Sequence, residues 1–325
     1  MAGIGTFISA GRSLETAIER VRLAESLGYD STYVTHIAGR DSLTVLAAYA
    51  AGTERIRLGT GVLPIYSRTP VATAQTAATI DEISGGRMIL GLGVSHRVTV
   101  EGWYGQTIGK PVTEMREYAG AVRAMFRGEE PPGGERWPTT FRFMGYDVRP
   151  ELPIYIAALS PKMLQLAGEI GDGVLLWLCD PPYVRDVVIP EVTKGRERAG
   201  KSLEGFDIVP AVPSAVTADR AATLDRVRAD LVTYLSLPFY RSMLERSGFE
   251  GEISRFDEAM ADGDVQRAKA AMSEGMLDSL GGFGSADDVR AAVGRYRDAG
   301  ATSPGISPVP SADFEATLEA GAELI

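Results

Sequence analysis

Two histidines are the only imidazole side chains in this sequence, and each follows a short apolar run that ends in small or polar residues. His36 comes directly after STYVT, and His96 comes directly after MILGLGVS. Because an imidazole gains or loses a proton near neutral pH, it can orient a substrate or carry a proton during a reaction. A purely structural hydrogen-bonding role is the alternative, and the sequence leaves both interpretations open for each histidine.

Several other chemistries lack the residues that they need. No lysine lies inside a predicted strand, so a Schiff-base mechanism has no candidate. Two histidines without an HxH pair cannot fill a binuclear metal site, and no G-x-S-x-G motif is present. We therefore expect no bound metal and no covalent nucleophile. The glycine-rich segments that remain suit a flat, bulky cofactor that carries the reactivity itself.

An apolar strand followed by a helix is the unit that repeats along the chain. Eight such strands indicate parallel pairing, and their near-continuous apolar runs indicate burial on both faces. The count favours an α/β fold of the (β/α)8 TIM barrel type over an open doubly wound sheet. The predicted strands cover residues 3–9, 31–36, 56–64, 87–95, 153–158, 173–178, 206–212 and 305–309.

The carboxyl ends of these strands define the candidate site, because barrel enzymes place their chemistry there. The third strand is unusual, since Gly59 and Gly61 interrupt its apolar run and predict a bulge or a close approach by a ligand. The candidate residues are Thr35, His36, Thr60, Gly61, Val62, Gly91, Gly93, Val94, Ser95, His96, Ala157, Ala158, Leu159, Ser160, Trp177, Leu178 and Cys179.

Two segments are longer than the repeated unit requires, namely residues 128–152 and residues 217–283. The first is rich in glycine, proline and aromatic residues, and the second holds several predicted helices. Such insertions usually hang over the C-terminal face of a barrel and shape its pocket. Solvent-exposed elaboration or a dimer contact is the alternative. Because no linker or repeat divides the chain, we expect a single domain over residues 1–325.

Composition narrows the possible partners. The net charge of −10 leaves no basic surface for a nucleic acid or an anionic membrane. No apolar segment approaches the length of a membrane span, and no leader peptide is recognisable, so we expect a cytoplasmic protein. The single cysteine, Cys179, fits a reducing compartment, and nothing beside it in the sequence would lower its pKa.

Three long stretches resemble the bacterial luciferase-like superfamily: GTGVLPIYSRTP, TIDEISGGRMILGLGVSH and LPIYIAALSPKMLQLAGEIGDGVLLW. The resemblance runs from about residue 3 to residue 310. It is greatest to the branch that uses the deazaflavin coenzyme F420, typified by methylenetetrahydromethanopterin reductase. Membership implies a non-prolyl cis peptide in the third strand, at Gly61–Val62, that presses on the cofactor ring. A plain bulge that closes the barrel is the alternative.

The resemblance also implies roles for other candidates. His36 matches a position near the reactive ring carbon, where it would orient substrate or shuttle a proton. Thr35 stands where several relatives have an acidic residue, so the substrate or the proton path can differ. Lys162 could meet a phosphate or carboxylate, or simply be solvated. The residues that would lie beside the ring are Gly93, Val94 and Ser95. Those that would lie near the cofactor phosphate are Ala157, Ala158, Leu159 and Ser160. The substrate pocket would contain His96, Trp177 and Cys179.

The expected function is hydride transfer between reduced coenzyme F420 and an unsaturated or carbonyl- or imine-type small molecule. The first alternative is an FMN-dependent monooxygenase supplied by a separate flavin reductase, which shares the barrel. The second is a ligand-binding barrel without catalysis, against which the two histidines and the glycine segments argue. We expect a small-molecule substrate and a homodimer, and the substrate itself cannot be identified from the sequence.

Overall fold

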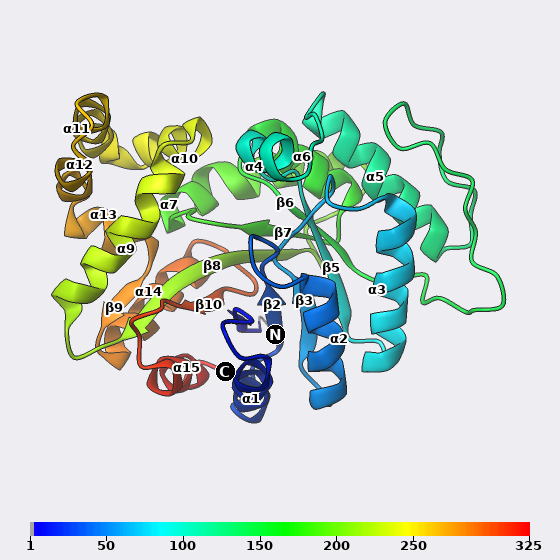
Figure 1. Cartoon of the computed structure of the whole chain (residues 1–325), viewed down its shortest axis with the longest axis horizontal. Helices are drawn as coiled ribbons and strands as arrows, with labels where there is room; N and C mark the ends of the chain where they lie inside the picture. The colour runs from blue at the N-terminus through cyan, green and yellow to red at the C-terminus, as the bar shows by residue number, and fades with distance from the viewer. Residues whose placement is uncertain (1–2) are drawn as a thin grey trace. The chain divides into compact units, whose positions relative to one another are not determined.

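The computed structural model describes residues 3–325, in which strands and helices alternate (Figure 1). An eight-strand parallel barrel with surrounding helices confirms the predicted (β/α)8 fold class. The chain divides into two compact units. The N-terminal unit contains residues 7–175 and 191–207, and the C-terminal unit contains residues 3–6, 176–190 and 208–325.

The N-terminal unit contains a parallel sheet in which β2 pairs with β3, β3 and β4 with β5, β5 with β6, and β6 with β7. Its strands are β2 (Ser31–Val34), β3 (Arg57–Thr60), β4 (Leu63–Pro64), β5 (Met88–Gly93), β6 (Ile154–Ala157) and most of β7 (Gly173–Leu176). Its helices are α1 (Leu14–Ser26), α2 (Ser42–Gly52), α3 (Pro70–Ser84), α4 (Arg97–Trp103), α5 (Pro111–Phe126), α6 (Pro161–Ile170) and most of α8 (Ile189–Arg198).

The C-terminal unit contains the remaining strands, in which β10 pairs with β1 and β8, and β8 pairs with β9, all in parallel. The strands are most of β1 (Gly5–Phe7), most of β8 (Asp207–Val216), β9 (Gly282–Gly284) and β10 (Gly305–Pro308). The helices are α7 (Pro181–Tyr183), η1 (Val184–Val188), α9 (Arg220–Leu235), α10 (Pro238–Leu244), η2 (Glu245–Phe249), α11 (Glu250–Ala261), α12 (Val265–Ala271), α13 (Glu274–Leu280), α14 (Ala286–Asp298) and α15 (Phe314–Ala322).

Local signals in the sequence explain where the first helices begin and end. The side chains of Ser13, Asp41 and Thr69 each accept a hydrogen bond from a backbone N–H of the first turn of α1, α2 and α3. Such caps satisfy donors that a helix otherwise leaves unpaired. Helix α3 ends at Gly85, whose φ of 69° is left-handed. These helices therefore start and stop at residues that the sequence pattern identifies.

The third strand contains the bulge that its glycines predict. Leu58 and Gly59 pair with Met88 and Ile89, but beyond the bulge Leu63 pairs with Leu92. The offset between partners falls from 30 to 29 residues, so the third strand has one extra residue here. The Gly61–Val62 peptide bond within the bulge is cis, as the family resemblance implied.

The glycines of the third strand make room for aromatic rings of neighbouring strands. The Tyr33 ring occupies the space where a Cβ of Gly59 would lie. A Cβ on Gly61 would lie 2.8 Å from Phe7 Cε1 and 2.9 Å from Tyr33 Cβ. The rings of Phe7 and Tyr33 stack with their centroids 5.0 Å apart. Close packing inside the protein therefore leaves no room for a side chain at either position.

Residues 128–152 contain no helix or strand, and Figure 1 shows them as the long loop beside α3 and α5. Trp137 packs edge-on against Tyr118 of α5 and lies 6.1 Å from the ring of Tyr66, in the loop after β4. Further along the loop, Arg149 forms a bidentate ion pair with Asp81 of α3. Only the middle of this loop therefore reaches the loop after β4, at the carboxyl end of the sheet. The rest lies along α3 and α5.

The segment at residues 217–283 contains α9 to α13, as the sequence predicted, but it also contains β9 at its end. The strand β9 was not predicted, because three residues flanked by helices give no measurable strand periodicity. Throughout residues 3–325, every helix is too short or too polar to cross a bilayer.

Candidate active site

The carboxyl ends of β2, β3, β5 and β6 lie next to one another in the N-terminal unit. The Gly61 N–H donates to the Val34 carbonyl oxygen at 2.8 Å, which joins the ends of β3 and β2. A Cβ on Gly93 would lie 2.5 Å from Val62 Cγ2 and 3.5 Å from Ala157 Cβ. The carboxyl ends of four strands are therefore adjacent, and the predicted residues Val62, Gly93 and Ala157 lie close together.

Accessibility divides these residues into a surface layer and a supporting layer. The partly exposed residues are Gly61, Val62, Val94, Ser95, Ala157, Leu159 and Ser160. The buried residues are Thr60, Gly91, Gly93 and Ala158. The surface layer is small and mostly apolar, so it leaves room for a flat ring. The buried residues can act only by supporting it.

Thr60 joins two strands where the bulge interrupts their pairing. Its hydroxyl donates to the Gly91 carbonyl oxygen at 2.7 Å and accepts from the Gly91 N–H at 2.9 Å. The side chain is fully buried. The hydroxyl thus replaces backbone hydrogen bonds that the bulge removes, and Thr60 supports the site through Gly91.

We expect Thr60→Val to lower the free energy of unfolding by about 1–3 kcal/mol, because two buried backbone groups of Gly91 would lose their partner. Urea unfolding of both proteins measures this difference. Thr79→Val is the matched control, since the Thr79 hydroxyl bonds to Gln75 on an exposed helix face. Equal effects of the two substitutions would show that the Thr60 hydroxyl has no special structural role.

His36 lies against the N-terminus of α2. Its Nδ1 accepts a hydrogen bond from the Ser42 backbone N–H at 3.3 Å and lies 3.1 Å from Ser42 Oγ. Its side chain is 12% exposed. Burial is the main cause that lowers the pKa of His36; the Asp41 carboxylate acts to raise it, and the Arg68 guanidinium acts to lower it. The neighbouring Thr35 is exposed.

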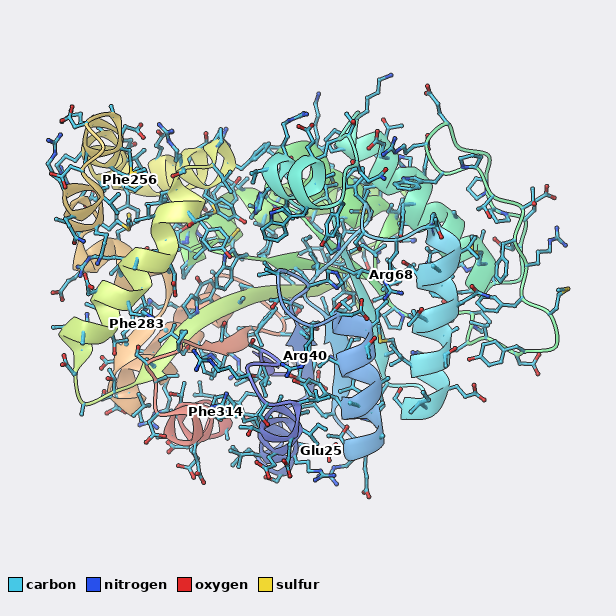
Figure 2. All side chains as sticks on the ribbon, in the orientation of Figure 1. Glu25, Arg40, Arg68, Phe256, Phe283 and Phe314 are labelled. Carbon is cyan, nitrogen blue, oxygen red and sulfur yellow. The ribbon has the colours of Figure 1, made fainter. Side chains whose placement is uncertain are left out.

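Two charged residues beside His36 were not among the predicted candidates. Asp41 Oδ2 lies 3.8 Å from His36 Nδ1 and accepts a hydrogen bond at 2.7 Å from Arg68, which is labelled in Figure 2. Arg68 belongs to the loop after β4, so this pair joins the loops that follow the second and third strands. The Asp41–Ser42 dipeptide before an apolar run is a helix-start signal, and it could have indicated this arrangement.

Arg40 fixes the loop after β2 to the loop after β1. Its guanidinium donates to the carbonyl oxygens of Gly11 at 2.5 Å and Arg12 at 2.8 Å (Figure 2). A planar guanidinium with several donors is suited to hold consecutive carbonyls. The loop that carries His36 is therefore anchored on one side by Arg40 and on the other by Arg68.

His96 begins helix α4, which the sequence did not predict. It is the N-cap residue, its side chain makes no capping hydrogen bond, and burial lowers its pKa. The preceding Ser95 has a φ of 60°, a left-handed conformation that is uncommon for residues other than glycine. Such conformations occur often at functional sites. They turn the chain sharply between β5 and α4.

The segment after β6 ends at the N-terminus of α6. Ser160 is the N-cap residue, but its side chain makes no capping hydrogen bond, and Pro161 follows it. Lys162 is exposed. The first N–H groups of α6 therefore have no side-chain cap from Ser160.

Trp177 and Cys179 belong to the C-terminal unit. Trp177 packs edge-on against Tyr234 at 5.8 Å and lines a pocket of about 60 Å³ together with Leu231 and Phe283. Cys179 is buried and is not among the residues that line this pocket, and burial raises the pKa of its thiol. Within residues 3–325, no three His, Cys, Asp or Glu side chains are grouped so that they could hold a metal ion.

Comparison with known proteins identifies the class to which this fold and site belong. The model of the luciferase-like monooxygenase family matches residues 1–303, and the chain belongs to this family.

Relatives within the family are similar over most of their length. The 5,10-methylenetetrahydromethanopterin reductase of Archaeoglobus fulgidus is 35% identical over 292 residues, which cover 87% of this chain and 86% of the reductase. A Mycobacterium tuberculosis protein, whose name assigns it to the coenzyme F420-dependent oxidoreductases, is 32% identical over 87% of this chain and 88% of its own length. Among solved structures, the coenzyme F420-dependent tetrahydromethanopterin reductase of Methanopyrus kandleri has a TM-score of 0.85 at 24% identity, with 99% of this chain and 97% of that chain covered.

Proposed function

We propose that this protein is a coenzyme F420-dependent oxidoreductase that transfers a hydride between the deazaflavin and an unsaturated or carbonyl- or imine-type small molecule. The observation that carries the proposal is the small-residue surface across the ends of β3, β5 and β6, together with a half-buried histidine that follows β2. The names of relatives that are 32% and 35% identical support the same conclusion.

The residues present fit a flat ring that carries an anionic side chain. Val62, Val94 and Ala157 are partly exposed and apolar, and no charged residue is among the surface layer described above. The N-terminus of α6 would meet the cofactor phosphate through N–H groups that Ser160 leaves uncapped. Lys162, exposed one turn into this helix, could add a positive charge.

When bound, the deazaflavin supplies a carbon-centred hydride donor or acceptor that reacts poorly with oxygen. The protein supplies shape, orientation and hydrogen bonds. His36, between the ends of β2 and α2, would orient the substrate, and Thr35 could donate a hydrogen bond beside it. His96 would contribute to substrate selection. Trp177 and Cys179 stay predicted pocket residues, and Cys179 is buried.

A titration with F420 and FMN side by side tests the proposal. We expect a dissociation constant for F420 in the micromolar range or lower, about −8 kcal/mol or better, and at least about tenfold weaker binding of FMN. An acidic protein must bind an anionic cofactor through local N–H groups and helix ends, and the ends of β5 and β6 supply them. Intrinsic cofactor fluorescence reports both titrations.

Tighter binding of FMN, with oxygen consumption by the reduced complex, would replace the reductase with an FMN-dependent monooxygenase. Failure of both cofactors to bind would favour a ligand-binding barrel without catalysis. The single domain, the homodimer and the cytoplasmic location stay predictions. Limited proteolysis tests the first, sedimentation the second and cell fractionation the third.

A further inference from the structure

We propose that Asp41 and Arg68 are positioning residues which, with the N-terminus of α2, hold His36 as a neutral imidazole that donates a hydrogen bond through Nε2–H. The inference rests on the proposed function only where it concerns substrate. Its structural part concerns the free protein and can be tested without any cofactor.

The tautomer of His36 follows from the donor that faces it. The Ser42 backbone N–H donates to His36 Nδ1 at 3.3 Å. A backbone N–H can only donate, so Nδ1 is the acceptor and carries no proton. In the neutral ring the single proton must then be on Nε2. The Ser42 hydroxyl, 3.1 Å from Nδ1, can donate to the same nitrogen.

The N-terminus of α2 also disfavours a second proton on this ring. Ser42 is the first residue of the helix, and the helix dipole places partial positive charge there. Protonation of Nδ1 would replace an N–H···N hydrogen bond by two opposed donors. The side chain of His36 is 12% exposed, so water could compensate little.

The charged groups that act on His36 are Asp41 and Arg68. Asp41 alone would favour a charged imidazolium, because its Oδ2 is 3.8 Å from Nδ1. That oxygen is paired with Arg68 at 2.7 Å, and Oδ1 accepts from the N–H and the hydroxyl of Thr44, each at 2.8 Å. Both oxygens of Asp41 therefore have other donors, and the ring stays neutral.

This tautomer determines what His36 can do for a substrate. With Nδ1 occupied, Nε2–H can donate to a carbonyl oxygen or imine nitrogen, but it cannot accept a proton. As a hydride reaches the carbon, the displaced electron pair moves to that acceptor atom, and the hydrogen bond stabilises the negative charge there. The proton taken up comes from water, because loss of the Nε2 proton would leave an anionic ring. In this state His36 therefore acts as a hydrogen-bond donor to the acceptor atom in either direction of hydride transfer, and not as a general base.

Nitrogen-15 NMR of histidine-labelled protein without cofactor tests the inference directly. The chain contains two histidines, and a His96→Asn variant assigns the signal of His36. We expect an unprotonated Nδ1 and a protonated Nε2 at pH 7. A His36 spectrum with the proton on Nδ1 would overturn the proposal.

Substitutions of the pair should move the titration midpoint of His36 in opposite directions. Arg68→Met leaves the Asp41 carboxylate without its partner, so we expect the midpoint to rise by about one pH unit. Asp41→Asn keeps a good helix cap and should lower the midpoint. The midpoint of the double variant should be close to that of the wild type. If Arg68→Met folds poorly, Arg68→Lys serves in its place: it keeps the charge, so its midpoint should equal that of the wild type.

Arg116→Met is the matched control, because it removes an arginine from the exposed Arg116–Glu169 pair, which is not among the groups that act on His36. We expect its His36 midpoint to equal that of the wild type. An unchanged midpoint in Arg68→Met would contradict the positioning role. The two proposals remain separable. The NMR experiment tests the His36 tautomer in the protein without cofactor, whereas the F420 titration tests the proposed function.

Discussion

Replacing His36 with alanine is expected to lower turnover by about 10² to 10³, as for the loss of one hydrogen-bond donor to a developing negative charge, with cofactor affinity nearly unchanged. The substitution removes the Nε2–H donor but leaves the small-residue surface of β3, β5 and β6 intact. Steady-state kinetics with F420 and a reducible substrate, together with a cofactor titration, separate the two effects. The split between turnover and affinity is the informative quantity.

His96→Ala is the comparison for this experiment, because His96 is the only other histidine and burial lowers its pKa as well. We expect a smaller loss of turnover, since His96 lies further along its loop, at the N-cap of α4. Unchanged turnover in His36→Ala would return His36 to the structural interpretation that the sequence left open.

Gly91→Ala is expected to cost about 3 kcal/mol of folding free energy or more and to abolish measurable cofactor binding. A Cβ at this position would overlap the backbone carbonyl oxygen of Thr60 and lie 2.6 Å from Leu175 Cδ1. Backbone cannot rotate away as a side chain can, so β3 and β5 would have to separate. The bulge that carries Val62 would move with them. Urea unfolding and an F420 titration measure the two losses.

Gly102→Ala is the matched control for this substitution. Gly102 lies in α4 of the same unit, and a Cβ there would meet nothing within 4 Å. Alanine in a helix is favoured over glycine, so we expect a gain of about 0.5–1 kcal/mol. A Gly91→Ala protein as stable as the wild type would show that the ends of β3 and β5 tolerate a larger spacing.

The alternation of strands and helices was predictable because it depends on local pattern. The caps Ser13 and Asp41 and the glycines that follow the helices are readable from residue type. The cis peptide at Gly61–Val62 was foreseen only through resemblance to a family, since no local rule distinguishes it from a plain bulge. The register change between β3 and β5 explains why the two glycines could signal the bulge itself.

Other features depend on contacts between residues far apart in sequence, which local pattern does not encode. Asp41 and Arg68 are 27 positions apart and join two loops. Nothing in the sequence of either loop indicates that the other lies beside it. Gly59 indicated a bulge or a close approach by a ligand; the bulge is present, and the Tyr33 ring fills the space beside Gly59. Thr60 was a candidate site residue, and its buried hydroxyl is bonded to Gly91.

The loop of residues 128–152 has a consequence for how this protein can change. It leaves and rejoins the barrel at one place, because Arg123 near the end of α5 donates to the Leu152 carbonyl at 3.0 Å, just before β6. A loop whose ends are fastened together can change length cheaply, since doubling it costs only about 0.6 kcal/mol. Met144, near its tip, is 91% exposed. This position should therefore accept an inserted tag or a small fused domain while the spacing of β5 and β6 is preserved. Natural variation in loop length can likewise occur here without disturbing the candidate active site.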